Sequence, residues 1–512
     1  MTTSSPALEL RRVNKWFGAV HANKDISLSV GRGTIHGIIG ENGAGKSTLM
    51  SIVYGFYQAD EGEILVNGSP YQIDNPQASI AAGIGMVHQH FMLVDTFTVL
   101  ENIILGVEGS ARLAGGLEHA RAELARLEKE YSLEVDVDAV VGDLPVGIRQ
   151  RVEILKALYR GAEILILDEP TGVLTPQEAD HLFRILNTLR EQGKTVILIT
   201  HKLREIMAIT DNVSVMRRGE MVAHVATKDT DREKLAELMV GRSVLLRVEK
   251  DDAQPAETVM SMRHVRYLDR DGVSRLKDIN LDIKAGEILG IAGVSGNGQS
   301  ELMEILGGTL RPSEGQIIYK GEDITNSANF NARDLRKIGL GHVPEDRHRS
   351  GLVLSFSAYE NTILGYHDRP EYNKGTTLDN SSMIAHCEKH IEKFDVRPTD
   401  PTLKASGFSG GNQQKLVLAR EMEQDPDILL VGQPTRGVDI GAIEFIHQQL
   451  IQMRDAGKAI LVVSVEIDEV MSLADRIAVM FDGAIVGELD AKDATETKLG
   501  LMMAGVKEGV EA

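Results

Sequence analysis

The sequence lacks several features that would indicate particular classes of protein. Its 512 residues include one cysteine, Cys387, which excludes an intrachain disulfide and any cysteine-rich zinc module. No apolar run approaches the ~18–20 residues that a membrane-spanning helix needs, and the first residues carry neither the basic patch nor the apolar segment of a secretory signal. The formal net charge of −20 is unlike the basic surface of nucleic-acid-binding proteins. We therefore expect a cytoplasmic protein that binds no nucleic acid and does not itself span a membrane.

The composition and an internal repeat indicate two globular domains. Hydrophobic residues make up 42% and charged residues 25% of the chain, as in ordinary globular proteins, and the length exceeds that of one ordinary core. Three segments recur in the same order in both halves: 24–30 as 277–283, 97–102 as 356–361, and 211–216 as 475–480. We expect a tandem duplication with domains at 1–245 and 258–512. The polar, proline-containing stretch 246–257 is predicted to be a linker.

Residues 40–48 match the phosphate-loop pattern G-x-x-x-x-G-K-[ST] at each required position. An apolar strand is predicted before this segment, over 34–39, and a helix is predicted to start at about residue 48. The glycines let successive backbone N–H groups point at phosphate, and the helix N-terminus adds partial positive charge. Lys46 is expected to reach the β- and γ-phosphates, and Ser47 to ligate Mg²⁺. The residues predicted to hold the nucleotide here are Gly40, Asn42, Gly43, Gly45, Lys46, Ser47 and Thr48.

A pair of carboxylates, Asp168 and Glu169, follows the apolar run 164–167. Short apolar strands alternate with helical patterns, which predicts an α/β fold with a mainly parallel sheet. In such a sheet the C-terminal strand ends open into the ligand crevice, so Asp168 suits a Mg²⁺ shell and Glu169 can activate water. The alternative is that the pair only forms a turn. His201 follows the next strand, 195–200, and is either a γ-phosphate sensor or a structural hydrogen-bonding residue.

With these motifs in place, each half resembles the nucleotide-binding domain of an ABC transporter, over roughly residues 7–242 and 258–505. The resemblance implies tandem P-loop NTPase domains, each with a mainly parallel core sheet, an antiparallel β part and a helical subdomain. It implies ATP and Mg²⁺ as ligands, residues 40–48 as Walker A, and Asp168 and Glu169 as the Walker B aspartate and catalytic base. It also implies Gln89 as the Q-loop glutamine that contacts Mg²⁺ and the membrane partner, and His201 as the switch histidine. Phe17 is implied to stack on adenine, with Trp16 as an adjacent alternative.

The two halves depart from the family pattern in complementary ways. The signature motif is intact in the second half, where Ser409, Gly410 and Gly411 are implied to bind the γ-phosphate held by the opposite domain, with Asp439 nearby. In the first half Pro145 replaces the signature serine, and Thr175 stands in place of Asp439. The second half in turn carries substitutions at the Walker, Q-loop and switch positions: Gln299, Gly432, Gln433, Val465 and Glu345.

Head-to-tail pairing, as in this family, implies one complete composite site and one catalytically silent site. The complete site joins the first half's Walker, Q-loop and switch residues to Ser409, Gly410, Gly411 and Asp439. The silent site joins the substituted residues of the second half to the signature that contains Pro145. Whether the two domains pair within one chain or between two chains stays open.

Two fused domains without membrane spans resemble the ATP-hydrolysing subunit of sugar-type bacterial importers. That resemblance implies two transmembrane permease subunits, an external substrate-binding protein, and a peripheral position at the cytoplasmic face of the membrane. Segments 88–94 and 344–349 are most similar to the nucleoside-importing branch, and ribose, galactose or xylose are the alternative substrates. A non-transport tandem ABC protein acting on ribosomes or DNA and a purely regulatory nucleotide-binding module are the competing classes.

Overall fold

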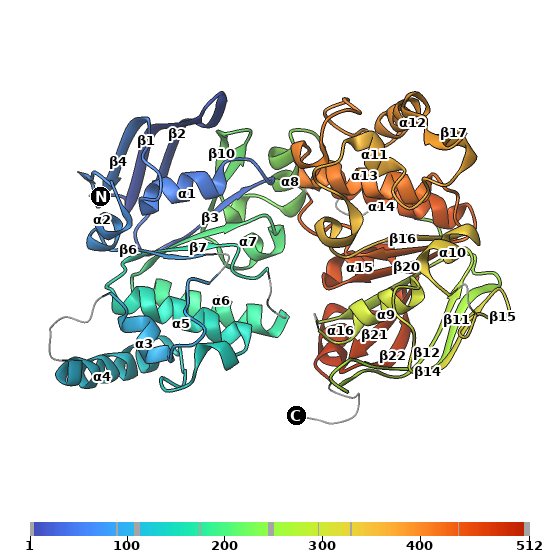
Figure 1. Ribbon diagram of the computed structural model, residues 1–512. Helices are drawn as coiled ribbons and strands as arrows, with labels where there is room; N and C mark the ends of the chain where they lie inside the picture. The colour runs from blue at the N-terminus through green and yellow to red at the C-terminus, as the bar shows by residue number, and fades with distance from the viewer. Residues whose placement is uncertain are drawn as a thin grey trace. The chain divides into compact units, whose positions relative to one another are not determined.

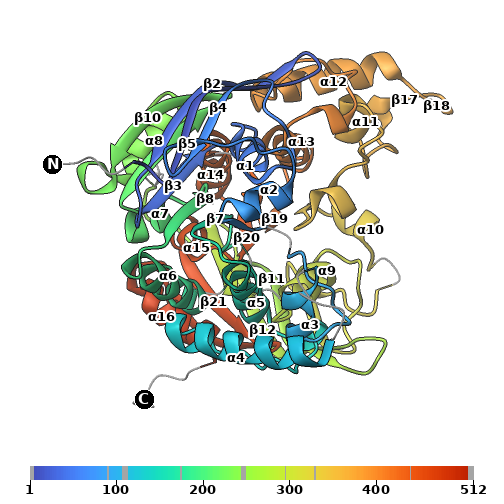
Figure 2. The same ribbon diagram turned by 90° about the vertical axis from the view of Figure 1, so that its left-hand side faces the viewer.

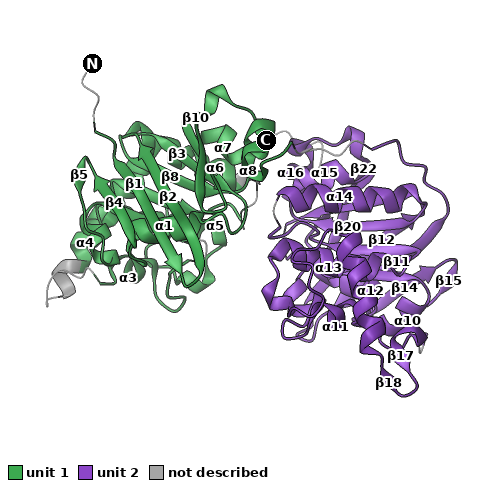
Figure 3. Cartoon of the chain, turned by 90° about the horizontal axis from the view of Figure 1, so that it is seen from above, with its two compact units in different colours: residues 1–244 green, residues 245–512 purple. Residues whose placement is uncertain are grey.

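The computed structural model describes residues 5–88, 91–106, 113–172, 174, 176–243, 250–294, 296–327, 330–438 and 440–505. The chain divides into two compact units, Met1–Val244 and Leu245–Ala512 (Figure 3). Three of the residues singled out from the sequence, Gln89, Thr175 and Asp439, lie outside the described residues.

The first unit contains a mainly parallel sheet and an antiparallel sheet. Among the described residues, six strands follow the order β10-β9-β3-β8-β7-β6, and only β10 runs antiparallel to its neighbour. The second sheet has the order β2-β1-β4-β5. The strands are β1 Leu8–Phe17, β2 Val20–Val30, β3 Ile35–Gly40, β4 Glu61–Val66, β5 Ser69–Pro70, β6 Ile84–Val87, β7 Ile164–Asp168, β8 Thr195–Thr200, β9 Asn212–Arg217 and β10 Glu220–Ala226.

Helices cover both faces of the parallel sheet. The helices are α1 Lys46–Tyr54, α2 Pro76–Ala81, α3 Val99–Ile104, α4 Leu113–Tyr131, α5 Val146–Tyr159, α6 Pro176–Glu191, α7 Leu203–Ile209 and α8 Arg232–Val240. In Figure 1, α1 lies between the two sheets, whereas α5 and α6 lie on the other face of the parallel sheet. Strands β3, β7 and β8 are buried along their whole length, as expected for parallel strands covered on both faces. Helices α3, α4 and α5 pack together as a helical subdomain (Figure 2).

The second unit repeats this arrangement. Its described strands form a six-stranded sheet of order β16-β19-β20-β13-β21-β22, a four-stranded sheet of order β12-β11-β14-β15 and the hairpin β17-β18. The strands are β11 Thr258–Leu268, β12 Ser274–Lys284, β13 Glu287–Gly293, β14 Glu314–Tyr319, β15 Glu322–Asp323, β16 Leu340–Val343, β17 Asn373–Lys374, β18 Thr377–Leu378, β19 Ile428–Gly432, β20 Ala459–Ser464, β21 Arg476–Phe481 and β22 Ala484–Asp490. The predicted tandem α/β architecture is confirmed.

The helices of the second unit also correspond to those of the first. They are α9 Gln299–Leu306, α10 Ala332–Lys337, α11 Ala358–Thr362, α12 Asn380–Lys393, α13 Gly410–Met422, α14 Ile440–Asp455, α15 Ile467–Leu473 and α16 Glu496–Met503. Helix α9 lies toward the antiparallel strands, and α13 and α14 lie on the opposite face of the parallel sheet (Figure 1). Among the helices that the structure describes, none combines the length and the apolar character that crossing a bilayer requires.

The described end of the predicted linker packs on the second unit. Lys250 donates hydrogen bonds to the Leu473 and Ala474 carbonyls, both at 2.7 Å, and pairs with Asp475 at 2.9 Å. A cation at the last carbonyls of a helix complements the helix dipole, and α15 ends at Leu473. Residue 250 is therefore held by the fold of the second unit.

A buried asparagine explains the repeat at 97–102 and 356–361. The Asn102 side chain accepts a hydrogen bond from the Val94 N–H at 2.8 Å and donates to the Val94 and Thr98 carbonyls. Asn361 does the same for Val353 in the second unit. Thr98 and Ser357 begin the short helices α3 and α11 with a capping box. The repeated segment therefore fixes the entry to the helical subdomain in each unit.

Replacing Asn102 with alanine tests this assignment. The change removes the partner of the Val94 N–H and of the Val94 and Thr98 carbonyls, and a typical hydrogen bond contributes about 0.5–1.5 kcal/mol. In hydrogen–deuterium exchange, we expect faster exchange in residues 91–106 of Asn102→Ala and no change in residues 350–365. Asn361→Ala is the matched control and should show the reverse pattern. Equal exchange in both segments of both variants would contradict the assignment.

Candidate nucleotide site

The phosphate loop connects the end of β3 to the start of α1. The helix begins at Lys46, earlier than the sequence pattern predicts, and Gly45 precedes it with φ 97°. A Cβ atom at Gly45 would lie 2.5 Å from the Ala22 carbonyl oxygen, so this position excludes any side chain. The loop therefore brings backbone N–H groups and a helix N-terminus to one point, which is an arrangement suited to phosphate.

The Lys46 ammonium lies inside the loop. Its Nζ donates to the Gly40 carbonyl at 2.7 Å and to the Glu41 carbonyl at 3.1 Å. The side chain is buried, and burial lowers the pKa of Lys46, whereas the nearby carboxylates of Glu169 and Asp168 act in the opposite direction. The loop thus holds one cation close to two carboxylates.

Asp168 is the last residue of β7 and lies beside the phosphate loop. Its carboxylate accepts a hydrogen bond from the Ser47 side chain. Burial and the negative charge of Glu169 raise the pKa of Asp168. A hydroxyl and a carboxylate in contact are the oxygen donors that Mg²⁺ takes when it is bound together with phosphates. The donor set therefore fits the predicted metal, with Ser47 and Asp168 as its ligands from these two elements.

Glu169 and His201 are in direct contact. His201 Nδ1 lies 2.9 Å from Glu169 Oε1, and the two residues follow the neighbouring strands β7 and β8. The hydrogen bond from His201 lowers the pKa of Glu169, and burial opposes that shift. Glu169 has φ 47°, a left-handed conformation that a non-glycine residue adopts at a cost of about 1–2 kcal/mol. This backbone turn aims the carboxylate at the edge where Lys46 lies.

Phe17 and Trp16 differ in their surroundings. The ring of Trp16 stacks on His21 with 4.1 Å between centroids, so one of its faces is covered. Phe17 is exposed at the end of β1, with Tyr57 at its edge and the Lys15 ammonium 5.6 Å from its centroid. Phe17 is therefore the more accessible of the two rings.

The second unit keeps the backbone of this site and changes its side chains. Gly298 has φ 99° before α9, and Gln433 has φ 46° after β19. Gln299 stands in place of Lys46, and its Nε2 donates to the Val294 carbonyl at 3.0 Å. Gln433 Oε1 accepts from the Val465 N–H at 3.3 Å. The loop is thus stabilised without a cation or a carboxylate at these positions.

One contact in the second unit does not follow from the sequence pattern. Ser300 corresponds to Ser47, and its hydroxyl donates to Glu345 Oε2 at 2.7 Å. The sequence places Glu345 only at the Q-loop position. The sequence does contain a signal for this contact. Gly432 stands where the first half has Asp168, and Glu345 stands where the first half has Gln89. The second half therefore lacks one carboxylate and carries another. The hydroxyl of the loop keeps a carboxylate partner in both units, from a different element in each.

The two signature segments start their helices differently. Ser409 is the N-cap of α13, and its Oγ accepts from Asn412 Nδ2 at 2.8 Å. Pro145 occupies the N-cap of α5, where it supplies no side-chain hydrogen bond. A proline at the N-cap precedes the helical hydrogen bonds and breaks none of them, so α5 forms while the serine hydroxyl and one backbone donor are lost. Ser409, Gly410 and Gly411 lie together at the N-terminus of α13.

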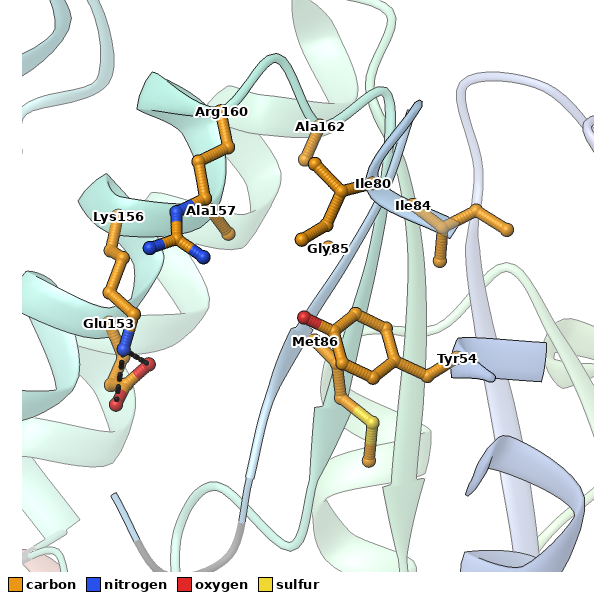
Figure 4. A pocket seen from close by; sticks show the side chains of 10 residues that line it. All are labelled: Tyr54, Ile80, Ile84, Gly85, Met86, Glu153, Lys156, Ala157, Arg160 and Ala162. Atoms are coloured by element: carbon orange, nitrogen blue, oxygen red, sulfur yellow. Dashed lines mark hydrogen bonds and ion pairs between the residues drawn. The ribbon is translucent and has the colours of Figure 1, made fainter. Parts of the chain in front are cut away.

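A hollow in the first unit is separate from these residues (Figure 4). It lies between α5 and β6 and contains the Glu153–Lys156 ion pair, at 3.3 Å, with the Tyr54 ring and the Arg160 guanidinium nearby. Its lining includes none of the residues predicted to hold ATP.

The pKa of Glu169 is a direct test of the contact with His201. Replacing His201 with alanine removes the largest cause of the lowered pKa while burial remains, so the Glu169 pKa should rise. A carboxyl group whose pKa is lowered by folding stabilises the folded state at pH values above its ordinary pKa. This stabilisation is lost as the pH falls from the ordinary pKa to the lowered pKa of the folded state. In His201→Ala this contribution should therefore be smaller, and its loss on acidification should end at higher pH. Carboxyl-labelled NMR, with the Glu169 signal assigned by Glu169→Gln, measures the shift. A smaller change is expected in Lys202→Gln, and a larger one there would contradict the assignment.

Known proteins are similar to this chain over nearly its whole length. The family model described as "ABC transporter" matches residues 23–172 and 276–436. The chain is 47% identical to the nucleoside import ATP-binding protein NupA of Lactococcus lactis, over 97% of this chain and 98% of that protein. It is also 47% identical to the guanosine import ATP-binding protein NupO of Bacillus subtilis, over 97% of each. The glucose import ATP-binding protein TsgD13 of Haloferax volcanii is 44% identical, over 98% of this chain and 96% of that protein. The chain belongs to the ABC transporter family and carries the ATP-binding cassette of that family twice.

Proposed function

We propose that this chain is the ATP-hydrolysing subunit of an ABC importer for nucleosides, with one complete catalytic site. The observation that carries the proposal is the cluster of Lys46, Ser47, Asp168, Glu169 and His201 at one end of the first unit's sheet. A cation, a hydroxyl–carboxylate pair and a histidine-bound carboxylate are the groups that phosphoryl transfer to water requires.

A role is proposed for each residue of the cluster. Lys46 and the N–H groups of the loop, at Gly40, Asn42, Gly43, Gly45, Ser47 and Thr48, bind the β- and γ-phosphates. Phe17 stacks on adenine. Glu169, kept ionised by the His201 hydrogen bond, accepts a proton from the attacking water, and His201 contacts the γ-phosphate.

Magnesium is the proposed metal. Mg²⁺ neutralises charge on the β- and γ-phosphate oxygens when it is bound with ATP. Ser47 and Asp168 would hold it, and Gln89 is proposed as a further ligand by resemblance.

The remaining half of the site is proposed to come from the second cassette. Ser409, Gly410 and Gly411 stand at the N-terminus of α13, where N–H groups and the helix dipole favour an anion. Asp439 is assigned to the same site by resemblance. The second cassette's own loop, with Gln299 and Gln433, is proposed to be catalytically silent. The proposed domains are 1–245 and 258–512, joined by 246–257.

Nucleosides are the proposed substrate class because two relatives that match nearly the whole chain at 47% identity are named nucleoside and guanosine importers. A sugar is the second candidate, since a glucose importer matches at 44%. By resemblance, the partners are two transmembrane permease subunits and an external binding protein, and the chain is peripheral at the cytoplasmic face of the membrane. No nucleic-acid partner is proposed.

The proposed base is tested by Glu169→Gln in the assembled transporter. The substitution keeps the shape of the side chain and removes its ability to take a proton, so ATP turnover should fall by about 10²–10⁴-fold. Gln433→Glu is the matched control and should change turnover little, because the loop lysine and the aspartate are still missing in that cassette. Substantial hydrolysis retained by Glu169→Gln would refute the assignment.

The substrate class is tested by uptake in cells that express the chain with its permease subunits and binding protein. Labelled guanosine should accumulate in an ATP-dependent way that Glu169→Gln abolishes. Unlabelled ribose or glucose in excess should not compete. Competition by a sugar with no guanosine uptake would favour the second candidate.

A further inference from the structure

The segment after β16 in the second unit, Pro344–Gly351, is here called the brace segment. Its second half forms a π-helical turn, Arg347–Gly351, which the Asp346 carboxylate caps by accepting from the His348 and Arg349 N–H groups at 2.9 and 3.1 Å. Because the turn is capped in this way, the side chains of the segment have defined directions. Glu345 and Arg347, two residues apart in the segment, contact two different parts of the second unit.

The brace segment contacts the second phosphate loop through Glu345. Glu345 Oε2 accepts the Ser300 hydroxyl at 2.7 Å. A Cβ atom at Gly432 would lie 2.6 Å from Glu345 Cγ and 2.9 Å from its backbone nitrogen. Any side chain at residue 432, including the aspartate found at this position in the first unit, would displace Glu345. The loss of the aspartate therefore creates the space that the anchor uses.

The turn of the brace segment contacts the helix that begins with the intact signature. Arg347 Nη1 donates to the Arg436 carbonyl at 2.7 Å, and its Nε lies 3.4 Å from Gln413 Oε1. His348 Nε2 lies 2.7 Å from the same Gln413 oxygen. Gln413 in turn donates to the Ala405 carbonyl at 2.9 Å and is buried. Through Gln413, the brace segment holds the first turn of α13, and Gln413 itself holds Ala405, which precedes the signature.

The Arg347 guanidinium lies against Gly410, where the backbone of Gly437 leaves no room for a side chain. A Cβ atom at Gly410 would lie 2.7 Å from Arg347 Nη2 and 2.8 Å from the Gly437 carbonyl oxygen. In the first unit the corresponding residues are Val146 and Phe91. The unit with the glycine signature therefore has the arginine, and the unit that lost the signature has neither. Both units have the same fold, but only the second has both the arginine and the glycine. The arginine is therefore associated with the signature and not with the shared fold.

We infer that Arg347 is a positioning residue for ATP hydrolysis: it fixes the signature loop at Gly410, and the Glu345–Ser300 contact anchors it. The inference rests on the proposed function, in which the signature completes the catalytic site. Donors aimed at a phosphate stabilise the transition state most when they are held in place before the reaction. A guanidinium beside a helix N-terminus adds positive charge where an anion is to be bound. The degenerate phosphate loop then serves as an anchor for the neighbouring signature.

The inference is tested with Arg347→Met, Arg347→Lys and the control Arg349→Met in the assembled transporter. Arg349 is exposed in the same turn, so its replacement removes the same charge from the same segment. Removing a preorganised donor costs about 10²–10³-fold in kcat. Arg347 acts through the loop, and we expect a smaller fall of about tenfold for Arg347→Met. The KM for ATP should change little, and Arg349→Met should leave kcat unchanged.

Two further measurements separate positioning from a merely structural role. ADP has no γ-phosphate, so its affinity should be the same in wild type and Arg347→Met, which also shows that the variant is folded. Arg347→Lys should restore part of kcat, because one amine can reach the Arg436 carbonyl but cannot also reach Gln413. Glu345→Ala should lower kcat in the same direction, and Glu345→Gln should not, because an amide oxygen can still accept the Ser300 hydroxyl.

The outcomes distinguish this inference from the proposed function. Unchanged kcat in Arg347→Met, or a higher KM with unchanged kcat, overturns the inference if Glu169→Gln still abolishes turnover. Equal losses in Arg347→Met and Arg349→Met also overturn it. Retained turnover in Glu169→Gln refutes the proposed function itself, whatever Arg347→Met does.

Discussion

The buried ammonium of Lys46 is the interaction on which the first unit's site depends. The loop carbonyls of Gly40 and Glu41 hold it, and the left-handed turn at Gly45 lets the loop close around it. Its charge faces two carboxylates that the parallel sheet brings to the same edge. Without this cation, Asp168 and Glu169 would be neighbouring negative charges in a partly buried crevice, and like charges there disfavour ionisation.

The second unit shows which features of the site persist when that cation is absent. Gln299 satisfies a loop carbonyl without charge, and Gln433 keeps the strained turn of Glu169 without its carboxylate. The backbone is therefore retained for reasons of fold, since each of these turns connects a strand of the same sheet to the next segment of the chain. The carboxylate partner of the loop hydroxyl is retained as well, as Glu345. One cassette can thus lack the lysine and the two carboxylates of the other and still keep the same backbone turns.

In each unit, one buried polar side chain holds the segment that leads into the helical subdomain. Asn102 and Asn361 bond both backbone groups of a residue eight positions earlier. A buried polar group is costly unless its partners are complete, so these residues specify one geometry for the segment. In the second unit this segment comes directly after the brace segment. Of these two segments, the brace segment is the one whose side chains contact the signature helix, through Gln413.

The sequence by itself determined the tandem α/β fold, the phosphate loop and the carboxylates at the end of β7, because these depend on local spacing and apolar runs. It also located Ser409–Gly411 and the substitutions that make the halves unequal. It did not determine the His201–Glu169 hydrogen bond or the different surroundings of Trp16 and Phe17. Nor did the sequence predict the contact of Glu345 with Ser300 or that of Arg347 with Gln413. Those pairs are far apart in the chain and meet only when strands and helices pack, so the tertiary structure alone decided them.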